Sequence, residues 1–188
     1  MTRHEEDLLA VRRCLNQDPA AFRDIVERYK NQIFSLIFRL VRNSSDAEDL
    51  SQETFIKAFK NLASYDPAHP LITWLFKIAH NRAIDFLRAK KPEAVSIDED
   101  EVGAFPEPST PIEKELETVL RREFLDGILT SLPPLYREAL ILRHKEGLDL
   151  KEMVEVLQIP EGTVKIRLFR ARKALKEKLE SVGGEAAA

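Results

Sequence analysis

The chain has 188 residues, of which 44% are apolar and 32% charged, enough for one large or two small globular domains. Its net charge of −3 gives no overall sign of a nucleic-acid or membrane partner. The single cysteine, Cys14, excludes an internal disulfide and a cysteine-rich zinc site, and it favours a reducing, cytoplasmic location. The acidic N-terminus and the lack of a long apolar run predict neither a signal peptide nor insertion into a membrane.

Charge is distributed unevenly along the chain. Residues 92–112 contain six acids, four prolines and no Lys or Arg, which is the composition of a linker without regular helix. The segment 163–178 holds seven basic residues and one acid. The predicted parts are a first domain (1–91), an acidic and proline-rich linker (92–112), a second domain (113–182) and a disordered tail (183–188).

Apolar residues recur at helical spacing in both domains, which predicts an all-α fold. The clearest stripe defines one long helix: Phe22, Ile25, Val26, Tyr29, Ile33, Ile37 and Leu40. A second helix follows Asn43, with Ser45 or Asp46 as its predicted N-cap. Its predicted buried residues are Ala47, Leu50, Phe55, Ala58, Phe59 and Leu62. A third helix, after the turn 65–70, is predicted to bury Leu75, Ile78, Ala79 and Phe86.

Three carboxylates share one face of the second predicted helix. Asp46, Asp49 and Glu53 stand at positions i, i+3 and i+7, with Gln52 and Ile56 beside them. Clustered carboxylates can hold a metal or act as acid and base, as in an all-helical hydrolase. Because no histidine or second acidic helix converges on them at a recognisable spacing, the pattern favours an acidic docking face for a basic partner helix.

Aromatic, amide and cationic side chains are interleaved over the turn 65–70 and the third helix. This group consists of Tyr65, His69, Trp74, His80 and Asn81, together with Lys77, Arg82 and Arg88. Stacking rings, amides and cations are what a site for unpaired, splayed bases requires. The alternative without a binding function is that Trp74 and Phe76 belong to the core, and that His69 and His80 are surface residues.

Beyond the linker, helices are predicted over 112–131 and over 136–145, the latter ended by Gly147. They are followed by a short helix, a tight turn and a longer basic helix over 150–178, which is the pattern of a helix-turn-helix. Its predicted internal contacts are Met153, Val154, Leu157, Ile159, Val164 and Leu168. The exposed start of the basic helix suits the major groove of DNA, although a solvated basic helix in an ordinary bundle would share its composition.

Four segments in this order resemble the extracytoplasmic-function sigma factors, the compact two-domain members of the sigma-70 family of bacterial RNA polymerase. They are DAEDLSQETFIKAFKNL, TWLFKIAHNRAIDFLR, LPPLYREALILRHKEGL and IPEGTVKIRLFRARKAL, and the likeness covers about residues 8–180. The chain departs from the family where Gln158 replaces a usual turn glycine, where Ile166 replaces a common serine, and in the loop 66–71 with its two prolines.

The resemblance implies a role for each surface. Core polymerase, through its β′ clamp helices, would bind Asp46, Asp49, Gln52, Glu53 and Ile56. The minus-ten element, partly single-stranded, would be recognised by Tyr65, Asp66, His69, Trp74, Lys77, Asn81 and Arg88. The minus-thirty-five duplex would be contacted by Thr163, Lys165, Ile166, Arg167, Phe169, Arg170, Arg172 and Lys173. The linker would thread the active-site cleft of the polymerase, and the helices before the helix-turn-helix would dock on its β-flap.

The expected function is therefore that of a sigma factor, which binds core polymerase, directs promoter-specific initiation and helps to melt promoter DNA. It would catalyse no reaction and need no metal or cofactor, and the resemblance adds an anti-sigma protein as a regulatory partner. The alternative from another class is a stand-alone helix-turn-helix regulator that binds duplex DNA without polymerase. Cys14 is expected to be a small core residue and not a redox switch.

Overall fold

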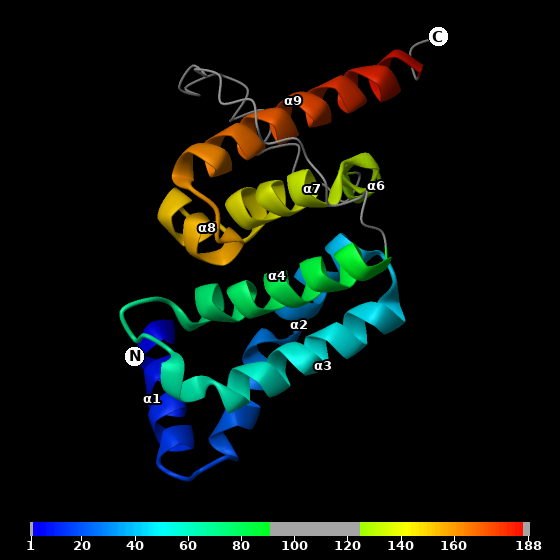
Figure 1. Ribbon diagram of the computed structural model, residues 1–188. Helices are drawn as coiled ribbons and strands as arrows, with labels where there is room; N and C mark the ends of the chain where they lie inside the picture. Colours follow the sequence, from blue (N-terminus) through cyan, green and yellow to red (C-terminus); the bar gives the residue numbers. More distant parts are fainter. Residues whose placement is uncertain (1, 91–124, 186–188) are drawn as a thin grey trace. The chain divides into compact units, whose positions relative to one another are not determined.

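The computed structural model describes residues 2–90 and 125–185, and the chain divides into two compact units, with the first boundary along the chain between Ala89 and Lys90. Every regular element in these two ranges is a helix (Figure 1), which confirms the predicted all-α, two-domain fold. None of these helices combines the length and the apolar composition that a bilayer span requires. The predicted linker 92–112 and most of the predicted helix 112–131 lie outside the described residues.

The first domain is formed by α1 (Arg3–Leu15), α2 (Ala21–Val41), α3 (Ser44–Lys60), the short 3₁₀ helix η1 (Leu62–Ser64) and α4 (Leu71–Lys90). Helix α2 packs against both α1 and α3. Ile33, Leu36 and Ile37 are fully buried, as are Leu71 and Leu75 of α4. The stripe predicted for α2 is therefore the centre of this core, because a helix that buries one face must find apolar neighbours along its whole length.

Two details of α3 differ from the predictions. Its N-cap is Asn43, whose side-chain oxygen accepts a hydrogen bond from the Asp46 amide at 3.0 Å. Ser45 and Asp46 lie inside the first turn and therefore cannot be the cap. Phe59 was predicted to be buried, but 45% of it is exposed. It follows Ala58, the last residue of the buried stripe, by one position and so stands at the edge of that stripe.

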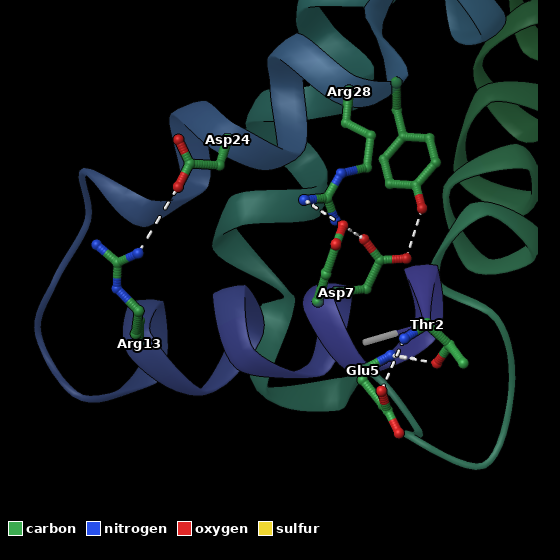
Figure 2. A network of polar contacts seen from close by, with 8 residues as sticks. Thr2, Glu5, Asp7, Arg13, Asp24 and Arg28 are labelled. Carbon is green, nitrogen blue, oxygen red and sulfur yellow. Dashed lines mark hydrogen bonds and ion pairs between the residues drawn. The ribbon is translucent and has the colours of Figure 1, made fainter.

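A buried polar network joins α1 to α2, and Figure 2 shows Asp7 and Arg28 pointing toward each other. Asp7 is only 3% exposed; its carboxylate accepts a hydrogen bond from the Tyr29 hydroxyl at 2.5 Å and pairs with the Arg28 guanidinium. Burial, and then the bond to Asp7, raise the pKa of Tyr29, so its hydroxyl remains a donor. Thr2 and Glu5 form a capping box at the start of α1. The contacts of Asp7 with Arg28 and Tyr29 fix the position of α1 on α2.

The second domain contains α6 (Leu125–Ser131), α7 (Pro134–Leu140), the π-helical turn η3 (Ile141–Lys145), α8 (Leu150–Leu157) and α9 (Glu161–Glu185). Helices α6 and α7 pack on α9 around a cluster of buried side chains: Ile128, Leu129, Leu132, Leu140, Ala171 and Leu175. The predicted helix 136–145 is α7 continued by the π turn. Helix α9 runs to Glu185, past residue 183, where a disordered tail was predicted.

Arg137 of α7 is a buried cation that holds the end of α6. It is 4% exposed, and its guanidinium donates to the carbonyl oxygens of Leu129, Thr130 and Leu132 at 2.8–2.9 Å. The last carbonyls of a helix have no partner within the helix. Arg137 supplies their hydrogen bonds, and the positive charge suits the negative end of the helix dipole. One side chain of α7 therefore bonds to the end of α6.

Candidate nucleic-acid and partner-binding surfaces

The first candidate surface, the α3 face, is the exposed side of α3. The opposite side is buried, and its Ser51 and Thr54 hydroxyls donate to carbonyl oxygens one turn earlier, at 2.6 and 2.7 Å. Because these polar groups are satisfied within the helix, the inner side can pack against apolar neighbours. The outer side carries the predicted docking residues: Asp46, Asp49, Gln52, Glu53 and Ile56. Asp46 is partly buried and the other four are exposed.

Two contacts at this surface were missed by sequence reasoning. Phe59 lies one turn beyond Ile56, and its exposed ring stands edge-on to Phe22 with centroids 5.1 Å apart. Ile56 is 55% exposed, so the acidic face continues into an apolar patch. The Glu53 carboxylate forms an ion pair with Arg82 of α4. A partner that binds Glu53 must therefore compete with a cation of the same domain.

The second candidate surface, the loop–α4 surface, is built around the segment between η1 and α4. Tyr65 is 7% exposed, and its ring lies 5.5 Å from the ring of Trp74. Its hydroxyl donates to the His69 carbonyl oxygen at 2.6 Å. The Asp66 carboxylate accepts from the Ala68 amide at 2.9 Å, a local turn that aspartate favours. The loop therefore has a definite shape in the isolated protein.

Helix α4 adds a polar row to this surface. Trp74, Lys77 and Asn81 are half-buried and stand at i, i+3 and i+7 on one side of the helix. They share one stretch of surface with Tyr65, Asp66 and His69, so the structure brings together six of the seven residues predicted for the minus-ten element. Arg88 is exposed two turns further along α4 and is not part of this group.

The same stretch includes residues that sequence reasoning did not assign to it, among them Lys57 and Asn61 at the end of α3. They stand four positions apart, a spacing that places them on one side of a helix and could have drawn attention to them. His80 was interpreted as a contact or surface residue, but it is 7% exposed and lies on the inner side of α4. Its neighbours at three and four positions, Phe76, Ala83 and Ile84, are buried, which explains why His80 is buried too.

The third candidate surface depends on the helix-turn-helix of α8 and α9. Asp149 and Glu152 form a capping box that starts α8. Gln158 ends α8 in the left-handed conformation, with φ 55°. Met153 and Leu157 are buried, as predicted, and Val156 is buried as well. Val154 and Ile159, expected in the contact, are half-exposed, because α8 turns Val156 inward and leaves these two at the edge.

Helix α9 buries one stripe and exposes a cationic face. Val164, Leu168, Ala171 and Leu175 follow each other at three- and four-residue steps and are buried. Arg167, predicted to contact phosphates, is 5% exposed because it lies three positions after Val164, on the buried side. The other predicted residues are exposed or half-buried and form what we call the α9 face: Thr163, Lys165, Ile166, Phe169, Arg170, Arg172 and Lys173.

An ion pair lies at the start of the α9 face. The Lys165 ammonium is 2.8 Å from the Glu161 carboxylate one turn earlier. The hydrogen bond and the charge of Lys165 lower the pKa of Glu161, so this carboxylate is ionised near neutral pH. A phosphate group that approaches Lys165 would meet this negative charge as well. Both domains thus carry an internal ion pair within a candidate surface.

Within residues 2–90 and 125–185, no group of three or more His, Cys, Asp or Glu side chains could hold a metal ion. The acids of the α3 face are spread along the outside of one helix. Cys14 is only partly buried, whereas a core position was expected. Burial raises the pKa of its thiol, which favours the unreactive protonated form. The chemistry available at the three surfaces is therefore recognition by charge, by apolar contact and by stacking.

Comparison with known proteins identifies both domains. The family model of Sigma-70 region 2 matches residues 25–93, and that of Sigma-70 region 4 matches residues 124–175. The chain is 36% identical over 178 residues to the ECF RNA polymerase sigma factor SigW of Bacillus subtilis, covering 88% of this chain and 92% of that protein.

Two solved structures have a similar fold. One is CnrH in complex with the cytosolic domain of CnrY, with a TM-score of 0.66, 23% identity, and coverage of 94% of this chain and 98% of that chain. The other is the sigma factor RpoE in complex with the anti-sigma factor NepR from Bartonella quintana. Its TM-score is 0.62 and its identity 26%, with coverage of 85% of this chain and 96% of that chain.

Proposed function

The chain belongs to the extracytoplasmic-function sigma factors of the sigma-70 family and directs transcription initiation by RNA polymerase, and we propose that it does so through the three surfaces described above. The α3 face binds core polymerase, the loop–α4 surface binds the minus-ten element, and the α9 face binds the minus-thirty-five element. The observation that carries this proposal is that the α3 and α9 faces lie on the exposed sides of helices whose other sides are buried, while the loop–α4 surface gathers a ring, an amide and a cation beside one loop.

The α3 face suits a basic helix of the polymerase. Its acids attract such a partner over several ångströms, while Ile56 and Phe59 offer apolar area that only close contact can bury. The β′ clamp helices are the proposed partner, and the ion pair of Glu53 with Arg82 is exchanged for one with a polymerase cation. Charge provides orientation and a fast encounter, and the apolar patch slows dissociation.

The loop–α4 surface suits unpaired bases. Trp74 provides a ring for stacking, Asn81 an amide that can bond to base edges, and Lys77 a cation for the phosphate backbone. Taking a base out of the duplex costs a few kcal/mol, which binding to this surface offsets in part. We therefore propose that the first domain helps to melt the promoter by capturing non-template bases as they unstack.

The α9 face suits the major groove of duplex DNA. Lys165 and Lys173 are exposed and can reach phosphates or base edges, while Ile166 and Phe169 offer apolar contact, for instance to thymine methyl groups. Arg167 is omitted from this set because it is buried. Phosphate contacts of this kind fix the position of a helix on the duplex, and contacts to base edges select the sequence.

The protein acts in this proposal as a dissociable specificity subunit without catalysis of its own, and it works in the cytoplasm together with the polymerase. An anti-sigma protein is a further proposed partner. Support comes from the similar structure of RpoE, which was solved in complex with the anti-sigma factor NepR. The β-flap of the polymerase is the proposed partner of the helices that precede α8.

Binding to core RNA polymerase tests the first of these surfaces. The variant Asp49→Lys reverses one exposed charge on the α3 face, and Asp85→Lys makes the same change at an exposed acid of α4. We expect Asp49→Lys to weaken binding to core about tenfold or more and Asp85→Lys to leave it nearly unchanged. Equal binding of both variants would remove α3 from the interface. Tight binding to duplex DNA without any binding to core would favour a stand-alone regulator.

A further inference from the structure

The loop 66–70, between η1 and α4, is tied back to the residue that precedes it. The Tyr65 hydroxyl donates to the carbonyl oxygen of His69, four residues later, at 2.6 Å. Within the loop, the Ala68 amide donates to the Asp66 carboxylate at 2.9 Å and the His69 amide to the Asp66 carbonyl oxygen at 3.2 Å. These hydrogen bonds close the segment into a compact turn.

Two prolines limit this segment further. Pro67 and Pro70 have fixed φ angles, and each also restricts the residue before it. Each backbone residue that must be ordered on binding costs about 1–2 kcal/mol of conformational entropy. A loop that already has its shape avoids most of this cost when a ligand binds.

The position of the Tyr65 hydroxyl is set by the core of the domain. Tyr65 is 7% exposed, and its ring lies against Trp74, whose own side chain belongs to the loop–α4 surface. Burial raises the pKa of Tyr65 to about 12, so the hydroxyl is a hydrogen-bond donor at any physiological pH. A side chain anchored in this way can hold a loop carbonyl in place and is not itself positioned by the loop.

We propose that the Tyr65 hydroxyl is a positioning group that preforms the loop 66–70 for selection among unpaired bases of the minus-ten element. The proposal rests on the function proposed above and adds a specific requirement to it. The loop selects bases by its fixed shape, and the hydrogen bond from the Tyr65 hydroxyl to the His69 carbonyl oxygen holds the middle of the loop in that shape. Without this bond, bases that fit poorly can be accommodated by a change in the loop, and discrimination falls.

The variant Tyr65→Phe removes the oxygen and keeps the ring. The matched control is Tyr29→Phe, which removes another buried hydroxyl of the same domain, one that donates to Asp7 and not to the loop. Each protein is combined with core RNA polymerase and offered a pool of promoter fragments in which the minus-ten segment is randomised. The readouts are the affinity for the preferred fragment and the base preference at each position.

We expect Tyr65→Phe to bind the preferred fragment roughly fivefold more weakly, the loss typical of one hydrogen bond, and to show a flatter base preference. In the free protein, the Ala68 and His69 amides should exchange hydrogen faster. Tyr29→Phe should lower the melting temperature without flattening the preference. A base preference that is unchanged in Tyr65→Phe, or flattened equally in both variants, would overturn the proposal. Failure of the unmodified protein to initiate at any fragment would instead contradict the proposed function.

Discussion

The loop–α4 surface of the first domain includes a loop whose shape depends on hydrogen bonds of Tyr65 and Asp66, whereas the α9 face of the second domain lies on one regular helix. On α9, each side chain takes its place from the helical repeat, with Val164 and Leu168 fixing which side is buried. In the loop, the place of each group depends on contacts with particular partners. A substitution on the α9 face should therefore alter only the contact of that one residue. A substitution outside the loop–α4 surface, by contrast, can change the shape of its loop.

Asp7 in the first domain and Arg137 in the second are both buried charged residues that join two helices, and they differ in their partners. Asp7 is bonded to the side chains of Tyr29 and Arg28, so it depends on another residue's charge. Arg137 donates to three backbone carbonyls at the end of α6, which are present whatever side chains α6 carries. The Asp7 contacts should therefore be lost when Arg28 or Tyr29 is changed, whereas the bonds of Arg137 should survive substitutions in α6.

The largest effect is expected for Arg137→Met. Methionine has a similar length but removes the hydrogen bonds to the carbonyls of Leu129, Thr130 and Leu132, and we expect a loss of about 2–4 kcal/mol in the free energy of unfolding. Urea denaturation monitored by circular dichroism measures it. Arg88→Met, at an exposed position of α4, is the control and should cost less than about 0.5 kcal/mol. A similar small cost for both variants would show that Arg137 is not an anchor.

A second pair of variants separates stacking from charge. Trp74→Ala removes the ring of the loop–α4 surface and should weaken binding to a single-stranded oligonucleotide of the minus-ten sequence by about 1–3 kcal/mol in holoenzyme. The salt dependence of that binding should stay the same. Lys173→Gln on the α9 face should instead weaken duplex binding and reduce its salt slope by about 1. If Trp74→Ala changed the salt slope and Lys173→Gln did not, the two surfaces would have been assigned the wrong way round.

Gln158 offers a smaller and stabilising change. It has φ 55° at the end of α8, a conformation that costs a side-chain-bearing residue energy and costs glycine little. Gln158→Gly should therefore raise the free energy of unfolding by about 0.5–1 kcal/mol. Thermal denaturation tests this, with Gln158→Ala as the control that retains Cβ. Destabilisation by glycine would mean that Gln158 contributes a contact worth more than its backbone strain.

The smallest effects concern the internal ion pairs of the α3 and α9 faces, Glu53 with Arg82 and Glu161 with Lys165. Each pair lies at the surface, with only Arg82 partly buried, so breaking either pair should cost the fold less than about 1 kcal/mol. Arg82→Gln should tighten binding to core polymerase, and Glu161→Gln should tighten binding to duplex DNA, each by about two- to fivefold. Isothermal titration at low and high salt measures both. Weaker binding in either variant would show that the pair orients its partner and does not compete with it.

The helical repeat made the regular parts of the molecule predictable. The buried stripe of α2, the helix-turn-helix and the acidic side of α3 all follow from apolar spacing. Errors occurred at the edges of such stripes, where Phe59 is exposed while His80 and Arg167 are buried. Residue type favoured the opposite assignment at each of these positions. Burial there depends on which side of the helix the residue faces, and a shift of one position along the helix changes that side.

Other features could not be identified from periodicity alone. The bond from Tyr65 to His69 depends on loop conformation, and the contacts of Asp7 and Arg137 join segments by side chains whose partners are not marked in the sequence. Lys57 and Asn61 belong to the loop–α4 surface because η1 turns the chain back toward α4. Such sites require the packed structure, because they are defined by which segments meet.

The most direct test of the central claim is transcription in vitro with core RNA polymerase, with and without this protein, on a library of promoter fragments from the source genome. We expect initiation at a subset of fragments only when the protein is present, and loss of that initiation in Asp49→Lys with the fold intact. Sequences shared by the active fragments would then give the promoter consensus. Absence of initiation, together with tight binding of the protein alone to duplex DNA, would contradict the account.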